Sequence, residues 1–200
     1  MLIGLGLGPG DPELLTLRAV RLLREADAVF VPGGIAHGLV APYRDAEVLP
    51  FPMSDDEAVV RQAVEESAER IARVARGGLA VFALLGDPNV FSTFARLAAV
   101  IRKRYPEIPC TTVPGISAIT AFASVAGVTL TGAFTVSDGG GERGRILLKV
   151  RRPREEAERL AKEGFREFVL VERMFLDGER VYRDQLPESS TYLSILFAGR

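Results

Sequence analysis

The chain has little of what metal and disulfide chemistry needs. Cys110 is the single cysteine and His37 the single histidine among 200 residues. No intrachain disulfide can form, and neither a cysteine-based zinc site nor a histidine-rich metal site is expected. We interpret Cys110, in a predicted strand, as a buried unreactive thiol and His37 as a surface histidine in a loop. The sequence therefore predicts no metal site.

The sequence also lacks an excess of charge of one sign and a long apolar run. Its 25 basic and 26 acidic residues give a net charge of −1, which argues against sequence-independent binding to nucleic acid. No stretch approaches the length of a membrane span. The apolar start, residues 1–7, is short and has no basic residues before it, unlike a secretion signal. We expect a cytoplasmic protein with neither a nucleic-acid nor a membrane partner.

Apolar residues are abundant enough for a sizeable core. They make up 48 % of the chain, against 26 % charged residues. In the first half, strand-like and helix-like patterns alternate, which predicts an α/β domain with a mostly parallel sheet and flanking helices. The second half predicts a mixed α/β domain, and we place the boundary between residues 1–112 and 113–200. The expected strands are residues 2–7, 28–31, 79–85, 110–113, 134–136, 146–150, 168–171, 181–183 and 193–197, and the expected helices are residues 12–25, 54–76, 90–104, 116–126 and 153–163.

Three predicted strands each run into a turn rich in glycine and proline, at residues 4–11, 84–93 and 113–118. The first turn does not have the G-x-G-x-x-G spacing of dinucleotide-binding loops. Taken singly, each turn is also explained by a tight strand-to-helix connection, and Asp87 by capping of the helix that follows. Because parallel strands end at one edge of a sheet, the three turns together predict a ligand cleft.

No catalytic residue can be identified from the sequence. The predicted cleft is not accompanied by a Ser/His/Asp or Cys/His nucleophile set. A small-molecule binder with few acid or base groups fits group transfer from a reactive cosubstrate better than hydrolysis.

The three turns resemble motifs of one enzyme family, the tetrapyrrole methylases. Residues 6–12, 86–94 and 113–118 are similar to the first, second and third motifs of that family, in the same order along the chain. Residues 49–54 and 171–173 further resemble the C20-methyltransferases of corrin synthesis, which act on precorrin-2 or cobalt-factor II. The resemblance implies a C20-methyltransferase of cobalamin biosynthesis that uses S-adenosyl-L-methionine.

The resemblance also implies an arrangement of the site. The cosubstrate is expected in a cleft between two α/β domains, and the protein is expected to be a homodimer. The residues that the motifs assign to the cosubstrate are Pro9, Leu85, Gly86, Asp87, Val90, Ser92, Thr93, Ser117, Ala118 and Met174.

The sequence departs from the family at two places. Phe30, Val31 and Pro32 stand where uroporphyrinogen-III methylases carry a Tyr-Asp pair, which disfavours that substrate. The stretch 129–145 is too short for the helix that C20 enzymes usually place there. The alternatives are a methyltransferase of the same fold acting on another corrin carbon, on ribosomal RNA or on a modified translation factor, and a non-catalytic tetrapyrrole-binding homologue. Candidates for pairing with substrate carboxylates, or else solvated surface charges, are Arg18, Arg44, Arg151 and Arg152.

Overall fold

The chain forms two compact units, Met1–Ala133 and Phe134–Arg200. The computed structural model describes residues 1–52, 54, 56–137, 139–183 and 185–200. Positions 53 and 55, which belong to the expected corrin-type segment and to the expected start of a helix, lie outside the described residues. The units divide later than the expected boundary at residue 112. One reason is that the amide of Gly115 donates a hydrogen bond to the Asp87 carboxylate and keeps the third turn attached to the first unit.

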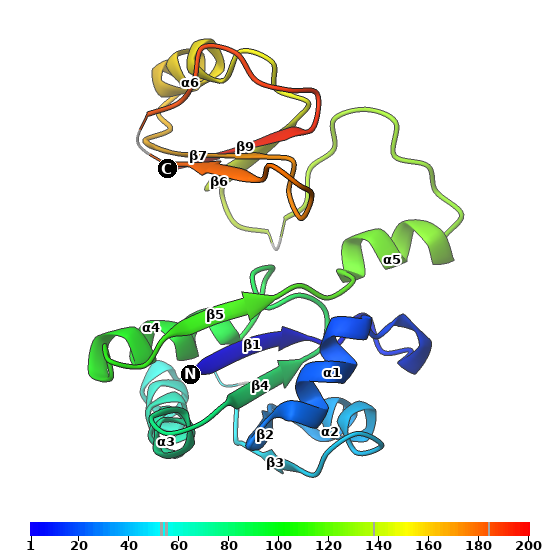
Figure 1. Cartoon of the computed structure of the whole chain (residues 1–200), viewed down its shortest axis with the longest axis vertical. Helices are drawn as coiled ribbons and strands as arrows, with labels where there is room; N and C mark the ends of the chain where they lie inside the picture. The colour runs from blue at the N-terminus through cyan, green and yellow to red at the C-terminus, as the bar shows by residue number, and fades with distance from the viewer. Residues whose placement is uncertain (53, 55, 138, 184) are drawn as a thin grey trace. The chain divides into compact units, whose positions relative to one another are not determined.

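The first unit is built on a five-stranded sheet in which every pairing is parallel. The strand order is β3-β2-β4-β1-β5, so β1 lies between β4 and β5 at the centre of the three turns (Figure 1). All five residues of β1 are buried, because helices cover both faces of the sheet. The strands are β1 Leu2–Gly6, β2 Ala28–Val31, β3 Ala46–Val48, β4 Ala80–Leu84 and β5 Cys110–Val113.

Alternate residues of the strands face two separate cores. On one face, Leu2 and Phe82 pack with helices α3 (Glu57–Ala75) and α4 (Phe94–Arg104). On the other face, Leu5 and Val81 pack with α1 (Leu17–Glu25) and α2 (Gly34–Val40). This is the α/β arrangement that the alternating pattern predicts, with one pair of helices on each face (Figure 1). Helix α5 (Ala118–Val125) follows β5 and buries none of its residues.

Several element boundaries differ from the expected ones, each for a local reason. Residues 12–14 form a short 3-10 turn capped by Asp11, and α1 begins only at Leu17 because the backbone of Leu15 is extended. Helix α4 begins at Phe94 rather than at residue 90, since Phe91 has a left-handed backbone. The expected strand 134–136 is not formed. Helix α2, which contains a half-buried His37, and strand β3 were not expected from the sequence.

The second unit pairs a four-stranded sheet with one helix. The strand order is β6-β9-β7-β8, and all described pairings are antiparallel, where the sequence suggested a mixed sheet. Helix α6 contributes Leu160, and the chain after it contributes Phe165, to a core with Leu170 and Leu196 of the sheet. The elements are β6 Gly144–Leu148, α6 Pro153–Lys162, β7 Glu167–Glu172, β8 Arg180–Tyr182 and β9 Ser194–Gly199.

Candidate ligand site at the carboxyl edge of the parallel sheet

The first two glycine turns are joined directly to each other. The amide of Gly86 donates a hydrogen bond of 2.7 Å to the carbonyl of Gly8, and the amide of Gly8 returns one of 3.3 Å to the carbonyl of Gly86. These turns follow β1 and β4, which are neighbours in the sheet. The strand order therefore brings together two segments that lie almost 80 residues apart in the sequence.

Asp87 ties the third turn to the second. Its Oδ2 accepts a hydrogen bond of 3.2 Å from the amide of Gly115, and its Oδ1 accepts one of 2.8 Å from the amide of Asn89. The side-chain amide of Asn89 in turn donates to the hydroxyl of Thr112 at 3.0 Å. The Asp87 carboxylate thus has a structural role, and it keeps lone pairs for a further donor because an ionised carboxylate offers about four acceptor sites.

Glycine is required where the three turns touch. A Cβ atom added to Gly6 would lie within 3.0 Å of the backbone of Gly115 and of Gly86, and one added to Gly115 would lie within 3.0 Å of the backbone of Gly6 and of Gly86. Backbone atoms cannot move aside as the end of a flexible side chain can. The convergence that the sequence predicts is confirmed, and close contact between the three backbones maintains it.

The second turn leaves backbone and apolar side chains open to a ligand. Gly86 has a φ of +73°, and a Cβ atom there would meet nothing within 4 Å. The side chains of Leu85 and Val90 are each 38 % exposed, and that of Phe91 is 68 % exposed. This edge of the sheet therefore offers free space beside the Gly86 backbone, next to exposed apolar side chains. Neither Asn89 nor Phe91 was singled out in the sequence, because only their hydrogen bonding and backbone conformation distinguish them.

Cys110 lies at the amino end of β5, whereas the three turns follow the carboxyl ends of their strands. Burial raises the pKa of the Cys110 thiol at the start of β5, which lowers its reactive thiolate fraction. Within the described residues, no group of three or more His, Cys, Asp or Glu side chains is placed to hold a metal ion. Over the same part of the chain, no helix is long and apolar enough to cross a membrane.

The order of the motifs and the fold agree with one protein family. The model of the family described as Tetrapyrrole (Corrin/Porphyrin) Methylases matches residues 1–189. The chain belongs to this family. The solved structure of the methyltransferase CobJ has the same fold, with a TM-score of 0.52 and 20 % identity over 100 % of this chain and 93 % of that one.

Curated relatives of this tetrapyrrole methylase include proteins named as C20-methyltransferases and others named as siroheme synthases. A probable cobalt-precorrin-2 C(20)-methyltransferase of Methanocaldococcus jannaschii is 32 % identical over an alignment of 136 residues, which covers 64 % of this chain and 57 % of the relative. A precorrin-2 C(20)-methyltransferase of a Sinorhizobium species is 35 % identical over an alignment of 148 residues, which covers 64 % of this chain and 59 % of the relative. A siroheme synthase of Nitrosococcus oceani is 39 % identical over 128 residues, 63 % of this chain and 26 % of the relative. The chain thus spans less than two thirds of the length of each of these relatives.

Most residues that the motifs assign to the cosubstrate lie on the three joined turns of this tetrapyrrole methylase. Pro9 is half-buried in the first turn. The Ser92 hydroxyl donates to the carbonyl of Pro88 in the second. Ser117 caps α5 by accepting from the amide of Ile119 at 3.2 Å, so both hydroxyls have partners within the protein. The remaining members on these turns are Leu85, Gly86, Asp87, Val90, Thr93 and Ala118.

Met174 is the exception among these residues. It lies in the second unit, in the loop between β7 and β8, and its side chain is 46 % exposed. Its assignment to the cosubstrate stays a prediction.

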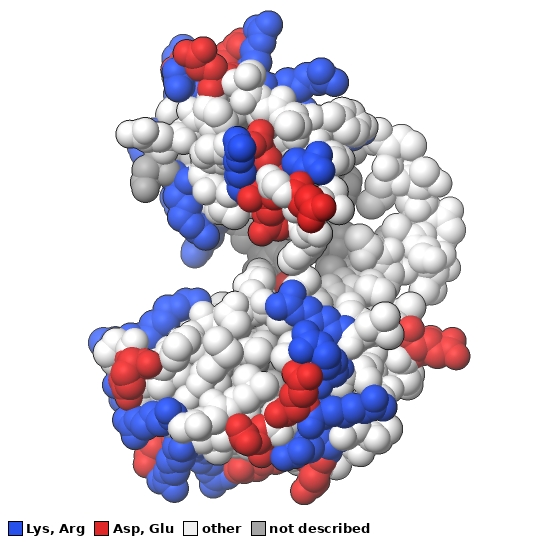
Figure 2. Space-filling model, in the orientation of Figure 1, with Lys and Arg blue, Asp and Glu red and all other residues white. Residues whose placement is uncertain are grey.

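Charged side chains of both signs are interspersed over the visible face of the methylase (Figure 2). Of the four arginines considered for substrate carboxylates, two have partners within the protein. Arg44 donates to the carbonyl of Asp27 at 3.2 Å, and Arg152 pairs with Glu155 at 3.2 Å. These two contacts favour the interpretation as structural or surface charge for Arg44 and Arg152.

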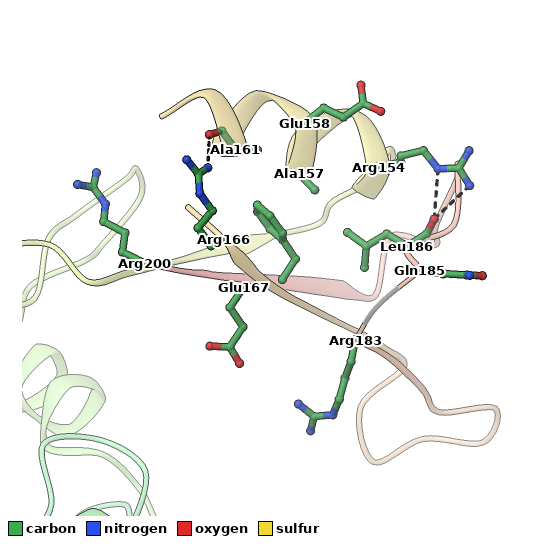
Figure 3. A pocket seen from close by; sticks show the side chains of 11 residues that line it. Arg154, Ala157, Glu158, Ala161, Arg166, Glu167, Arg183, Gln185, Leu186 and Arg200 are labelled. Carbon is green, nitrogen blue, oxygen red and sulfur yellow. Dashed lines mark hydrogen bonds between the residues drawn. The ribbon is translucent and has the colours of Figure 1, made fainter. Parts of the chain in front are cut away.

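A separate hollow lies within the second unit of the methylase, between α6 and the sheet (Figure 3). It has a volume of about 880 Å³, and four arginines are among its lining residues. Two of them already bind the backbone: Arg154 donates to the carbonyl of Leu186 and Arg166 to that of Ala161. These two arginines therefore fasten α6 to its surroundings. The hollow contains none of the residues that the motifs assign to a ligand.

Proposed function

We propose that this protein is an S-adenosyl-L-methionine-dependent methyltransferase that methylates C20 of precorrin-2 or cobalt-factor II in cobalamin biosynthesis. The observation that carries the proposal is the junction of three glycine turns through Asp87 at the carboxyl edge of the parallel sheet, without a nucleophile set. Membership of the tetrapyrrole methylases and two relatives named as C20-methyltransferases support it.

The turns have the chemistry that the cosubstrate needs. The space beside Gly86, where a Cβ atom would meet nothing within 4 Å, leaves room for a ligand, and Leu85 and Val90 can cover its apolar parts. The free lone pairs of Asp87 can accept from a ligand hydroxyl or amine. We assign cosubstrate binding to these residues together with Pro9, Ser92, Thr93, Ser117 and Ala118.

S-adenosyl-L-methionine supplies a methyl group already activated on a sulfonium sulfur. The chain needs only to hold C20 of the electron-rich acceptor in line with that methyl group and to keep the two aligned. As the new carbon–carbon bond forms, the sulfur–methyl bond breaks, and the proton on C20 is then released to solvent. No strong base from the chain is required, which agrees with turns whose two carboxylates, Asp11 and Asp87, already accept hydrogen bonds from backbone amides.

A second candidate acceptor is uroporphyrinogen III, which we consider because siroheme synthases are among the relatives. One feature disfavours this acceptor. Uroporphyrinogen-III methylases carry a Tyr-Asp pair at this place, whereas this chain has Phe30 and Val31 at the end of β2, followed by Pro32. We also propose a homodimer, on the family resemblance alone.

Methyl transfer to defined acceptors tests the proposal. The purified protein is incubated anaerobically with S-adenosyl-L-methionine and, in separate reactions, precorrin-2, cobalt-factor II or uroporphyrinogen III, and product mass is followed. We expect one added methyl, at C20, on precorrin-2 or on cobalt-factor II. Methylation of uroporphyrinogen III alone would replace the C20 assignment by the second acceptor. Binding of tetrapyrrole without any methyl transfer would identify a carrier.

A further inference from the structure

Phe91 combines two features that are both unfavourable for the folded protein. Its backbone φ is +46°, in the left-handed region that non-glycine residues, and bulky ones above all, rarely adopt. Its side chain is 68 % exposed, so burial of the ring does not compensate for the backbone strain. Strained residues persist where the surrounding structure fixes them, and they cluster at ligand-binding positions.

The second turn fixes Phe91 from both sides. Before it, the amide of Val90 donates to the carbonyl of Asp87 at 3.2 Å. After it, the hydroxyl of Ser92 donates to the carbonyl of Pro88, and the ring of Phe94 is buried against the sheet. The ring of Phe91 is exposed in the same turn as the exposed side chains of Leu85 and Val90.

We propose that Phe91 is a stacking platform for the broad face of the acceptor macrocycle; the proposal rests on the proposed function. A phenyl ring has no hydrogen-bonding group and offers only a flat, uncharged surface. A tetrapyrrole offers a matching apolar face and carries its carboxylates at the periphery. Adenine, the other flat group in the reaction, is distinguished by a polar edge that needs hydrogen-bonding partners, which a phenyl ring does not provide.

The substitution Phe91→Asn separates this role from a structural one, because asparagine tolerates a left-handed backbone. We expect the melting temperature to rise by about 2 °C as strain is relieved. The Kd for cobalt-factor II, measured anaerobically by absorbance titration, is expected to rise about tenfold. The Kd for S-adenosylhomocysteine, measured by calorimetry, is expected to stay unchanged. A purely structural residue would not give higher stability together with weaker acceptor binding.

Two further variants serve as controls. Phe91→Tyr keeps an aromatic ring and should retain cobalt-factor II binding within twofold. Lys149→Asn places asparagine at another left-handed position, φ +60°, in the second unit, where it also removes the contact of Lys149 with the ring of Tyr192, and it should change neither Kd.

Unchanged cobalt-factor II binding in Phe91→Asn would overturn the inference, and a selective loss of S-adenosylhomocysteine affinity would place the ring against adenine and overturn it as well. A wild-type protein that binds neither ligand would instead refute the proposed function itself.

Discussion

At the scale of single residues, the glycines of the three turns have two different functions. A Cβ atom on Gly6 or on Gly115 would clash with the backbone of the other, so the absence of a side chain there allows the two backbones to pack together. Gly86 has a positive φ, and a Cβ atom there would meet nothing within 4 Å, so glycine serves the backbone conformation and leaves space beside the turn. The sequence predicts that such turns matter, but it cannot tell these two uses apart, since both appear as glycine after a strand.

The substitution Gly115→Ala tests the first use. Its Cβ atom would meet backbone atoms of Gly6 and Gly86, and overpacking of this kind costs about 1–3 kcal/mol. Urea denaturation should show a lower free energy of unfolding by about that amount. Gly38→Ala in α2 is the matched control, because its Cβ would meet nothing within 4 Å, and alanine in a helix should stabilise by about 0.5–1 kcal/mol. Equal effects of the two variants would contradict the packing role of Gly115.

At the scale of elements, capping residues explain which helix boundaries the sequence predicts well. Asp56 caps α3 by accepting from the amides of Ala58 and Val59, close to where the acidic pattern places the start. Asp11 caps only a short 3-10 turn, and the working cap of α1 is Thr16. Helix α2 and strand β3 are too short to show a hydrophobic period, and their conformation depends on packing against β2.

The end of β7 is held by a buried carboxylate. Glu172 is 7 % exposed and accepts hydrogen bonds from the hydroxyl of Ser190 at 2.6 Å, from the amide of Thr191 at 3.3 Å and from the hydroxyl of Tyr182 at 3.3 Å. The bond from Ser190 is the main reason why the pKa of the Glu172 carboxyl lies below its usual value. One carboxylate therefore fastens β8 and the loop before β9 to β7.

This arrangement predicts a pH-dependent contribution to stability. Because the folded-state pKa of Glu172 is lowered, its contribution is fully present above the ordinary pKa of about 4.3 and is lost as pH falls through the folded-state value. Glu172→Gln should lower the free energy of unfolding by about 1–3 kcal/mol at pH 7 and by less in acid. The measurement is urea denaturation at pH 7 and at pH 4 or below. The exposed Glu158→Gln should change stability by less than about 0.5 kcal/mol at either pH, and a pH-independent effect of Glu172→Gln would refute this explanation.

At the scale of the whole chain, the alternating pattern was sufficient to predict a parallel α/β unit followed by a strand-rich unit. The boundary and the strand pairing were not predictable, because they depend on contacts between distant residues. Gly115 binds back to Asp87, and β6 and β7 both pair with β9. The junction of the three turns was predictable, because parallel strands that neighbour one another must end at the same edge.

The connection between the units is the expected site of first proteolysis. Between Val125 and Gly144, the described residues form no helix or strand and are exposed. Chymotrypsin at low ratio should therefore cleave first after Leu130 or Phe134, which are 46 % and 57 % exposed. Mass spectrometry of early fragments measures the position. First cleavage inside α3 or β4 would contradict the division into two compact units, whereas the buried Phe82 serves as an internal control that should be cut last.

The position of β1 at the middle of the first sheet has a consequence for synthesis. Leu2 pairs with Ala80 on one side and with Cys110 on the other. As the chain leaves the ribosome, its first strand must wait for about 80 residues before one neighbour emerges and for about 110 before the second. At ordinary translation speeds of about 5–20 residues per second, β1 spends several seconds as an unpaired apolar segment. Such a nascent chain is a natural client for chaperones, and the sheet is complete only once β5 has been made.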